Sequence, residues 1–302
     1  MATESDSDID PREPCYTYPP RPNAPEGPLT SMIQFEFKES VKVFDTTTDV
    51  GRSWDASLQA ISRLPKQCDL VWGSHAERSN RVTLFVGWPD GLPHGSIFDN
   101  EQTKSSSLLR SSAFSSLLPF LSTDPEIWTV FLIMPITRFS ARTRGQWELM
   151  TVYFPSDLPV TSSVDVIASI SRNFISLEGL LSTATTQIAH DPSGDLEWYH
   201  RGWATHTVQG RQQRSWHAHV LLVVWTSPEA EARFKDANQP SYYGGVNCGS
   251  KPDDMWERRF VNPLKDLQKY GIQWDSCHFT GFHGWTEEVV AQESRRRCCI
   301  VQ

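Results

Sequence analysis

The order of apolar segments repeats once along the chain, and this repetition constrains the fold more than any other feature. Residues 31–140 predict a strand, a helix, two strands, a helix and a strand, and residues 141–290 predict the same order again, with an additional helical piece before the last strand. Alternating apolar and polar residues, as in IQFEFK (33–38), are typical of a half-buried strand, whereas a spacing of three to four is typical of a helix. Each half therefore predicts the β-α-β-β-α-β order of a ferredoxin-like unit.

The two predicted units have these boundaries. The first unit is expected to hold strands at 33–38, 69–75, 81–88 and 126–136, with helices at 51–63 and 106–121. The second is expected to hold strands at 146–154, 197–208, 215–225 and 271–285, with helices at 162–181, 227–237 and 261–271. Flanking these units, residues 1–30 are rich in Pro, Asp, Glu and Ser and predict a disordered tail, and residues 291–302 form a C-terminal tail.

A short motif recurs on the second strand of each unit. LVWGSH (70–75) ends in Trp, a small residue, a hydroxyl residue and His, and RGWATH (201–206) ends in the same four classes. The third strands also both end in Trp, at Trp88 and Trp225. Matches in this order favour a tandem duplication, which would place His75 and His206 at equivalent positions.

Composition excludes several classes of protein. The chain has 302 residues, which suits two domains, and a net charge of −8, which argues against nucleic-acid binding. No apolar run reaches the roughly 18 residues of a membrane-spanning helix, and the acidic N-terminus lacks the apolar core of a signal peptide. Six cysteines without zinc-type spacing favour a reducing, intracellular compartment, either cytoplasmic or on the surface of an internal membrane.

One segment carries a resemblance to a known family. HVLLVVWTSPEAEARFKD (219–236), with VTLFVGWPD (82–90) as its fainter partner, resembles the dimeric α+β barrel superfamily, which includes antibiotic-biosynthesis monooxygenases. The resemblance implies an α+β fold in which two tandem ferredoxin-like units form one barrel within the chain. The Pro-rich tail followed by tandem halves is similar to fungal proteins, some of them linked to secondary metabolism, and the same fold hosts haem enzymes such as aldoxime dehydratases. A fold alone does not fix a function.

Histidines on the second unit's central hairpin are the main candidates for catalysis. An imidazole titrates near neutral pH and can transfer a proton or bind a metal, while an arginine can polarise a carbonyl. The candidate catalytic residues are His206, His217, His219, Arg201 and His75. The alternative interpretation is that these are packed or partly solvated polar residues, and no carboxylate or Cys completes an obvious metal set with them, so no metal is expected. His278 and His283 are expected on opposite faces of the last strand unless Gly281 forms a bulge, and either is a weaker candidate for a haem ligand.

Aromatic residues near these histidines are candidates for the wall of an apolar pocket. The candidate substrate-binding residues are Trp72, Trp88, Trp203, Trp225, Tyr199 and Phe282. Large aromatic side chains are more often part of a core, so packing remains the alternative. The resemblance implies a pocket between the sheet and the helices that binds a hydrophobic small molecule.

The last four residues, Cys299-Ile300-Val301-Gln302, fit a prenylation box. Cys298 is adjacent and Arg295–Arg297 lie just upstream, so lipid attachment at Cys299 and Cys298 would place the chain on a membrane surface. The alternative is a tail with two incidental thiols.

Three functions remain open at this point. The first is an enzyme without a cofactor that promotes cyclisation, cycloaddition or isomerisation of a terpenoid or polyketide. The second is a cofactor-free monooxygenase or a haem-dependent dehydratase on the same fold, and the third is a non-catalytic ligand-binding barrel. The expected partner is a hydrophobic small molecule rather than a nucleic acid, and the expected state is a monomer or homodimer.

Overall fold

The computed structural model describes residues 29–64, 70–88, 114–123, 125–131, 145–157, 196–204, 208–209, 215–236 and 256–285. Within these residues the strands are β1 (Leu29–Glu36), β2 (Leu70–His75), β3 (Arg81–Trp88), β4 (Glu126–Phe131), β5 (Gln146–Pro155), β6 (Leu196–Trp203), β7 (Val208–Gln209), β8 (Ser215–Trp225) and β9 (Gln273–Trp285). The helical segments are α1 (Asp49–Ser62), α5 (Pro228–Lys235), α6 (Asn262–Leu267), the 3-10 turns η2 (Ser115–Phe120) and η4 (Gln268–Tyr270), and the π-helical turn η3 (Glu257–Val261).

The strands form one antiparallel sheet in the order β4-β1-β3-β2-β9-β5-β8-β6, and β7 pairs with β8. Each half of this order is the ferredoxin-like arrangement, in which the first and third strands are central. β9 joins the halves because it pairs with β5 through its first part and with β2 through its second part. The end strands β4 and β6 also lie in contact, so the sheet curls round on itself. The predicted α+β fold of two tandem ferredoxin-like units in one barrel is confirmed.

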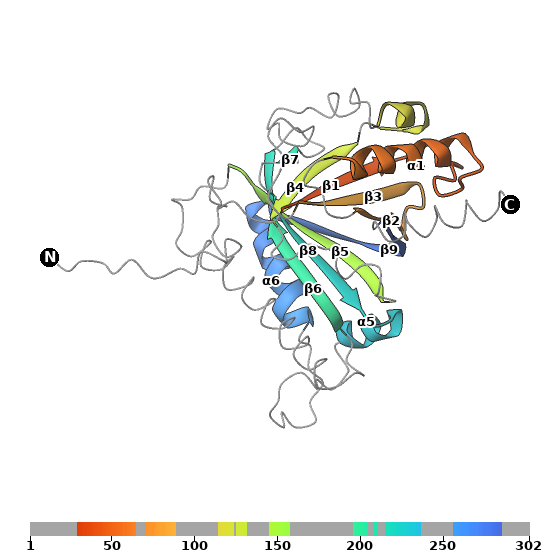
Figure 1. Cartoon of the computed structure of the whole chain (residues 1–302). Coiled ribbons are helices and arrows are strands. Elements are labelled where there is room, and N and C mark those ends of the chain that lie inside the picture. The colour runs from red at the N-terminus through yellow and green to blue at the C-terminus, as the bar shows by residue number, and fades with distance from the viewer. Residues whose placement is uncertain are drawn as a thin grey trace.

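Helices α1 and α5 each begin at a side-chain cap. The Thr48 side chain accepts a hydrogen bond from the backbone N–H of Gly51 at 3.1 Å, which caps α1. Ser227 caps α5 in the same way through the N–H of Ala230, also at 3.1 Å, and Pro228 occupies the first helical position. Figure 1 shows α1 over the first unit's strands and α5 and α6 beside those of the second unit.

Among the described residues, three large apolar clusters and one small one, formed by Ala204, Trp216 and Ala218, surround the sheet. One lies between α1, η2 and the outer face of the first unit, and a second lies between α5, α6 and the outer face of the second unit. The third fills the inner face and takes residues from both units: Met32, Val71, Phe85, Trp147, Leu149, Val220, Leu222, Val224 and Phe279. The inner cluster is the packing that makes the two units one folded body, since apolar burial is the main favourable term in folding.

Several predicted boundaries differ from the structure. β1 begins at Leu29, so two residues assigned to the tail belong to the sheet. The helix predicted over 106–121 is a 3-10 turn at Ser115–Phe120 in its described part, because Pro119 and the six serines of the segment disfavour a longer α-helix. The helix predicted at 162–181 and both chain termini lie outside the described residues. Among those that are described, no helix has the length and apolarity needed to cross a membrane.

The duplication is visible in the hydrogen bonds of the two terminal tryptophans. Trp88 pairs with Leu29 on β1, and its indole N–H donates to Ser31 Oγ at 2.9 Å. Trp225 pairs with Gln146 on β5, and its indole N–H donates to Glu148 Oε2, also at 2.9 Å. In both units the acceptor is two residues beyond the register partner, so Ser31 and Glu148 occupy equivalent positions.

The two Trp-x-x-His motifs, however, are not equivalent. Trp72 pairs with Leu84, four residues before Trp88, whereas Trp203 pairs with His219, six residues before Trp225. By the same register, the position of His75 corresponds to Ala204 rather than to His206. The predicted equivalence of His75 and His206 is therefore wrong by two residues, because the motifs record similar composition and not the register of the sheet.

Candidate functional site

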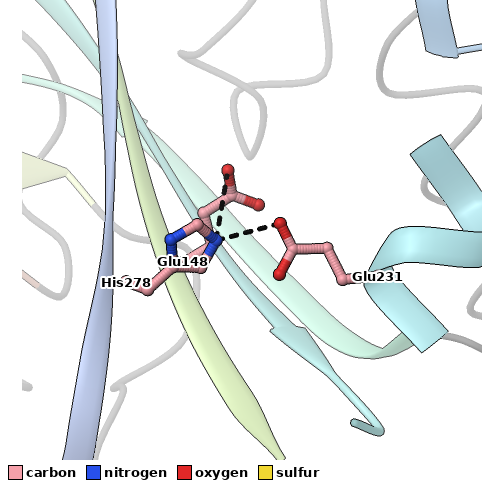
Figure 2. Close-up of side chains that lie close together, drawn as sticks. All are labelled: Glu148, Glu231 and His278. Carbon is pink, nitrogen blue, oxygen red and sulfur yellow. Dashed lines mark hydrogen bonds and ion pairs between the residues drawn. The ribbon is translucent and has the colours of Figure 1, made fainter. Parts of the chain in front are cut away.

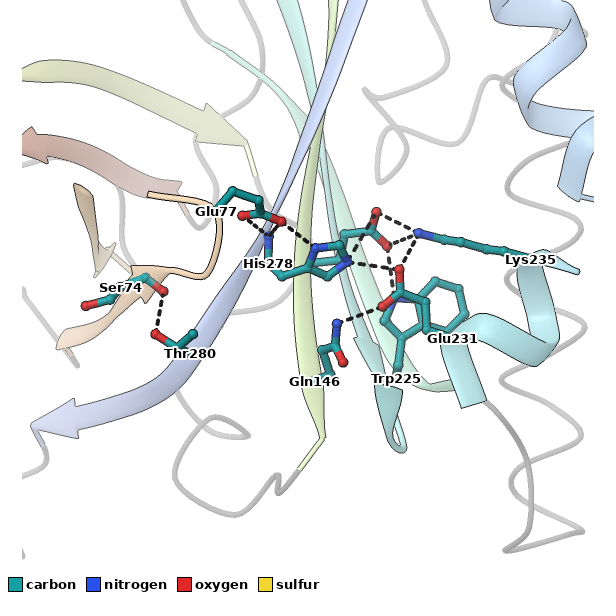
Figure 3. A network of polar contacts seen from close by, with 9 residues as sticks. Ser74, Glu77, Gln146, Trp225, Glu231, Lys235, His278 and Thr280 are labelled. Atoms are coloured by element: carbon teal, nitrogen blue, oxygen red, sulfur yellow. Dashed lines mark hydrogen bonds and ion pairs between the residues drawn. The ribbon is translucent and has the colours of Figure 1, made fainter. Parts of the chain in front are cut away.

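A cluster of charged side chains lies under α5, on the outer face of the second unit. We call Glu77, Glu148, Glu231, Lys235 and His278 the charged cluster (Figures 2 and 3). Its most buried member is Glu148, whose side chain is 1% exposed. Glu148 stands on the same face of β5 as Met150 and Val152, which belong to the apolar cluster beneath the helices. A carboxylate placed there needs charged or hydrogen-bonding partners, because burial of an unpaired charge is very costly.

The partners of Glu148 come from three elements. Trp225 donates from β8, and Lys235 Nζ lies 2.8 Å from both carboxylate oxygens. His278 is directly opposite Glu148 in the β5–β9 register, with Nε2 at 4.0 Å from Glu148 Oε1. The equivalent pair in the first unit is Ser31 opposite Thr129. The second unit therefore holds a Glu–His pair where the first has two hydroxyl residues.

Helix α5 adds a second carboxylate and the cation. Glu231 and Lys235 are four residues apart, so they face the same side of the helix, and Lys235 Nζ lies 2.5 Å from Glu231 Oε1. Gln146 donates to the other oxygen of Glu231 at 2.9 Å. The ammonium group also lies 5.4 Å from the ring centre of Trp225 and 5.0 Å from that of Trp256, within the range of cation–π attraction.

His278 is held between carboxylates of both units. Its Nε2 lies 2.9 Å from Glu231 Oε1, and its Nδ1 lies 2.7 Å from Glu77 Oε1. The hydrogen bond with Glu231 is the largest contribution that raises the pKa of His278 from 6.5 to about 9; partial burial opposes it, and the bond with Glu77 adds to it. Burial alone would raise the pKa of Glu231, but hydrogen bonds from His278 and Lys235 lower it. The raised pKa keeps the His278 ring protonated at neutral pH, between the acidic side chains of Glu77 and Glu231.

The geometry of the cluster also permits a comparison with metal sites. Ligand atoms of Glu148, Glu231 and His278 lie within 4.8 Å of one another. A metal ion would need His278 Nε2 without a proton and the space between the carboxylates. The ammonium of Lys235 already contacts both carboxylates, and the raised pKa of His278 keeps the ring protonated. These residues therefore fit a network of ion pairs, in which Lys235 and His278 are the cations, better than a metal centre.

The structure places the predicted catalytic histidines elsewhere. His75 is buried, and its Nε2 lies 2.7 Å from Thr83 Oγ1. Burial, assisted by the charge of Arg81, lowers the pKa of His75 to about 4, so its ring is neutral at pH 7. His217 and His219 share the face of Trp225, as alternation predicts. His219 is buried against Trp203, with ring centres 4.9 Å apart, and burial lowers the pKa of the half-buried His217.

Some of the remaining predicted residues are packed in the core, and the others lie outside the described part of the structure. Trp88 and Trp225 are fully buried, while Trp203 and Trp72 are 3% and 9% exposed, all within the apolar clusters under the helices. Arg201 and Tyr199 lie on β6 and Phe282 on β9, but their side chains are outside the described part of the structure. His206, Cys298 and Cys299 are also outside it. Substrate binding and lipid attachment at these residues stay predictions.

The bulge considered at Gly281 is present. Gly281 has φ of +103°, and the pairing of β9 with β2 shifts by one residue at this point. As a result His283 faces the same side of the sheet as His278 and stacks on Trp72 at 5.8 Å. Sequence reasoning considered His278 and His283 but missed the carboxylates. The signal that was available is Glu148 itself, the one charged residue in the strand QWELMTVYF.

Among solved structures, three have a low similarity to this chain. An anthrone oxidase-like protein has 8% sequence identity and a TM-score of 0.48, with 86% of this chain and 94% of that chain covered. A candidate monooxygenase of Fusobacterium nucleatum has 9% identity and a TM-score of 0.41, with 86% and 98% covered. An aldoxime dehydratase in complex with butyraldoxime has 10% identity and a TM-score of 0.25, with 86% and 79% covered.

Neither a family model nor a curated protein matches the sequence. The identities and TM-scores of these three structures are too low to define either the fold or the chemistry of this chain. The assignment of the fold therefore rests on the strand order and register, which show an α+β chain of two tandem ferredoxin-like units joined in a curled antiparallel sheet.

Proposed function

We propose that the chain is an enzyme that acts on a hydrophobic small molecule through the charged cluster, without a cofactor, and promotes a cyclisation or isomerisation. The observation that carries this proposal is the difference between the two units. In the first unit the buried indole N–H of Trp88 donates to the neutral side chain of Ser31, so the fold does not need a charge at this position. The second unit buries Glu148 there and surrounds it with Lys235 and His278.

These groups can donate hydrogen bonds to an atom of the substrate on which negative charge develops. Glu77 and Glu231 have lowered pKa values, despite the opposing effect of burial, so they stay ionised and are weak bases. Their role is to keep His278 charged and in place, and Glu231 also holds Lys235 in place. The side chains of His278 and Lys235 are each 24% exposed, so both cations reach the edge of the cluster. Fixed donors at a carbonyl oxygen stabilise charge that develops in a transition state.

In the proposed reaction a carbonyl oxygen of the substrate displaces Glu231 Oε1, which His278 Nε2 and Lys235 Nζ both contact, and accepts hydrogen bonds from these two groups in its place. Withdrawal of electron density through that oxygen activates a conjugated substrate toward ring closure or a shift of a double bond. All atoms of the substrate remain in the product, so the step needs no oxidant or reductant. The wider assignment, to terpenoid or polyketide substrates of fungal secondary metabolism, belongs to the same proposal and is supported by the sequence resemblance.

Comparative metabolite profiling tests this proposal, because the masses separate the reaction classes. Cells that lack the chain are complemented with the wild type, with His278→Gln, or with Ser31→Ala as the matched position in the first unit. We expect the His278→Gln cells to accumulate a precursor of the same mass as the missing product, and Ser31→Ala to behave as the wild type. A mass difference of one oxygen would instead indicate a monooxygenase, and one water a dehydratase. An unchanged profile would indicate a non-catalytic barrel.

The same comparison with purified protein measures the rate of the reaction. Once the accumulated precursor is isolated, its conversion is followed with the wild type and with His278→Gln. Loss of one preorganised donor reduces kcat by about 100-fold or more in comparable sites. Equal rates in both proteins would show that the charged cluster takes no part in the reaction.

A further inference from the structure

The charged cluster lies in the second unit except for one member. Glu77 follows β2 of the first unit, in the turn that connects β2 with β3. The backbone N–H of the preceding residue, Ala76, donates to the carbonyl oxygen of His278 at 2.8 Å, so this turn is anchored directly to β9. The contact lies where the two units meet (Figure 3).

The carboxylate of Glu77 binds His278 at two points. Both of its oxygens lie 3.1 Å from the backbone N–H of His278, and Oε1 lies 2.7 Å from Nδ1. An acceptor at Nδ1 fixes a proton on that nitrogen, so that Nε2 is the atom presented to Glu231 and Glu148. The same two contacts prevent rotation of the ring, because the backbone and the side chain of His278 are tied to one group.

We propose that Glu77 is a positioning residue, by which the first unit orients and charges the His278 ring of the second unit. The charged cluster is then a composite of residues from both units. The groups that face His278 are Glu77 from the turn after β2, Glu148 from β5 and Glu231 from α5, while Lys235 balances the latter two. This role rests on the function proposed above, whereas the orientation of the ring does not.

Glu77→Gln tests the effect of the Glu77 charge on His278. In this variant the amide oxygen still accepts from the backbone N–H of His278, while the negative charge is lost. The imidazole of His278 is titrated by NMR in the wild type, in Glu77→Gln and in Glu77→Asp. Glu257→Gln, which removes a surface ion pair with Lys265, is the control. We expect the pKa of His278 to fall by about 1 unit or more in Glu77→Gln, to stay close to the wild-type value in Glu77→Asp, and not to change in Glu257→Gln.

The second readout is the pH dependence of turnover. If His278 acts as a cation, activity is lost as pH rises through its pKa, and in Glu77→Gln this loss moves to lower pH by the same amount as the titration. A titration of His278 that is unchanged in Glu77→Gln would overturn the inference, and so would a shifted titration with an unmoved pH profile of turnover. A shifted titration in a protein that converts no substrate would keep the orientation of the ring and reject the enzymatic function.

Discussion

The stability of the protein should depend on pH through His278, and this prediction follows directly from the charged cluster. The pKa of His278 rises from 6.5 to about 9 on folding, chiefly through the hydrogen bond with Glu231. A histidine with a raised pKa binds its proton more tightly in the folded state. Its contribution is therefore fully present below pH 6.5 and is lost as pH rises toward 9.

The magnitude follows from the size of the shift. One pKa unit corresponds to about 1.4 kcal/mol, so the full shift would correspond to about 3 kcal/mol. Because the ring is partly exposed, solvent screening reduces this figure, and we expect about 1–2 kcal/mol. His278→Gln removes the titrating group and with it this part of the pH dependence.

Urea unfolding of the wild type and His278→Gln, measured from pH 6 to pH 10, provides the assay. The difference between their free energies of unfolding should shrink by about 1–2 kcal/mol between pH 6.5 and pH 9.5. His283→Gln is the matched control, because burial lowers the pKa of His283 and its contribution changes only below pH 6.5. Parallel curves for the wild type and His278→Gln across this range would refute the proposed protonation of the cluster.

Three substitutions test other parts of the structure by thermal or urea unfolding. Gly51→Ala should destabilise the protein by about 2 kcal/mol or more, because the new Cβ would lie 2.0 Å from the carbonyl oxygen of Asp45; an unchanged Tm would contradict this close approach. Lys235→Met should cost about 3–5 kcal/mol because it leaves the carboxylate of Glu148 buried without its cation, and Glu148→Gln in the same chain should recover most of the loss. Gly281→Ala should cost about 1–2 kcal/mol through its positive φ, and no loss would show that the bulge relaxes without strain.

The sequence by itself determined the architecture of this protein. Periodicity of apolar residues depends on which face of a strand or helix is buried, and that information is local. The order of strands and helices and the shared face of His217 and His219 were therefore readable from the chain. Duplication was readable as well, because the terminal tryptophans of β3 and β8 stand at equivalent points.

Only the tertiary structure decided which polar residues meet. Glu77, Glu148, Glu231 and His278 lie far apart in the sequence, and they converge because β9 pairs with β5 and β2 while α5 packs over β8. Register also decided that His75 corresponds to Ala204. Equivalent positions are set by the hydrogen-bonded pairing of the strands and not by the similarity of two short sequence motifs. A pKa depends on distances to neighbouring charges, and no local pattern contains these distances. For this reason the buried His75 stays neutral at pH 7 while the ion-paired His278 is charged.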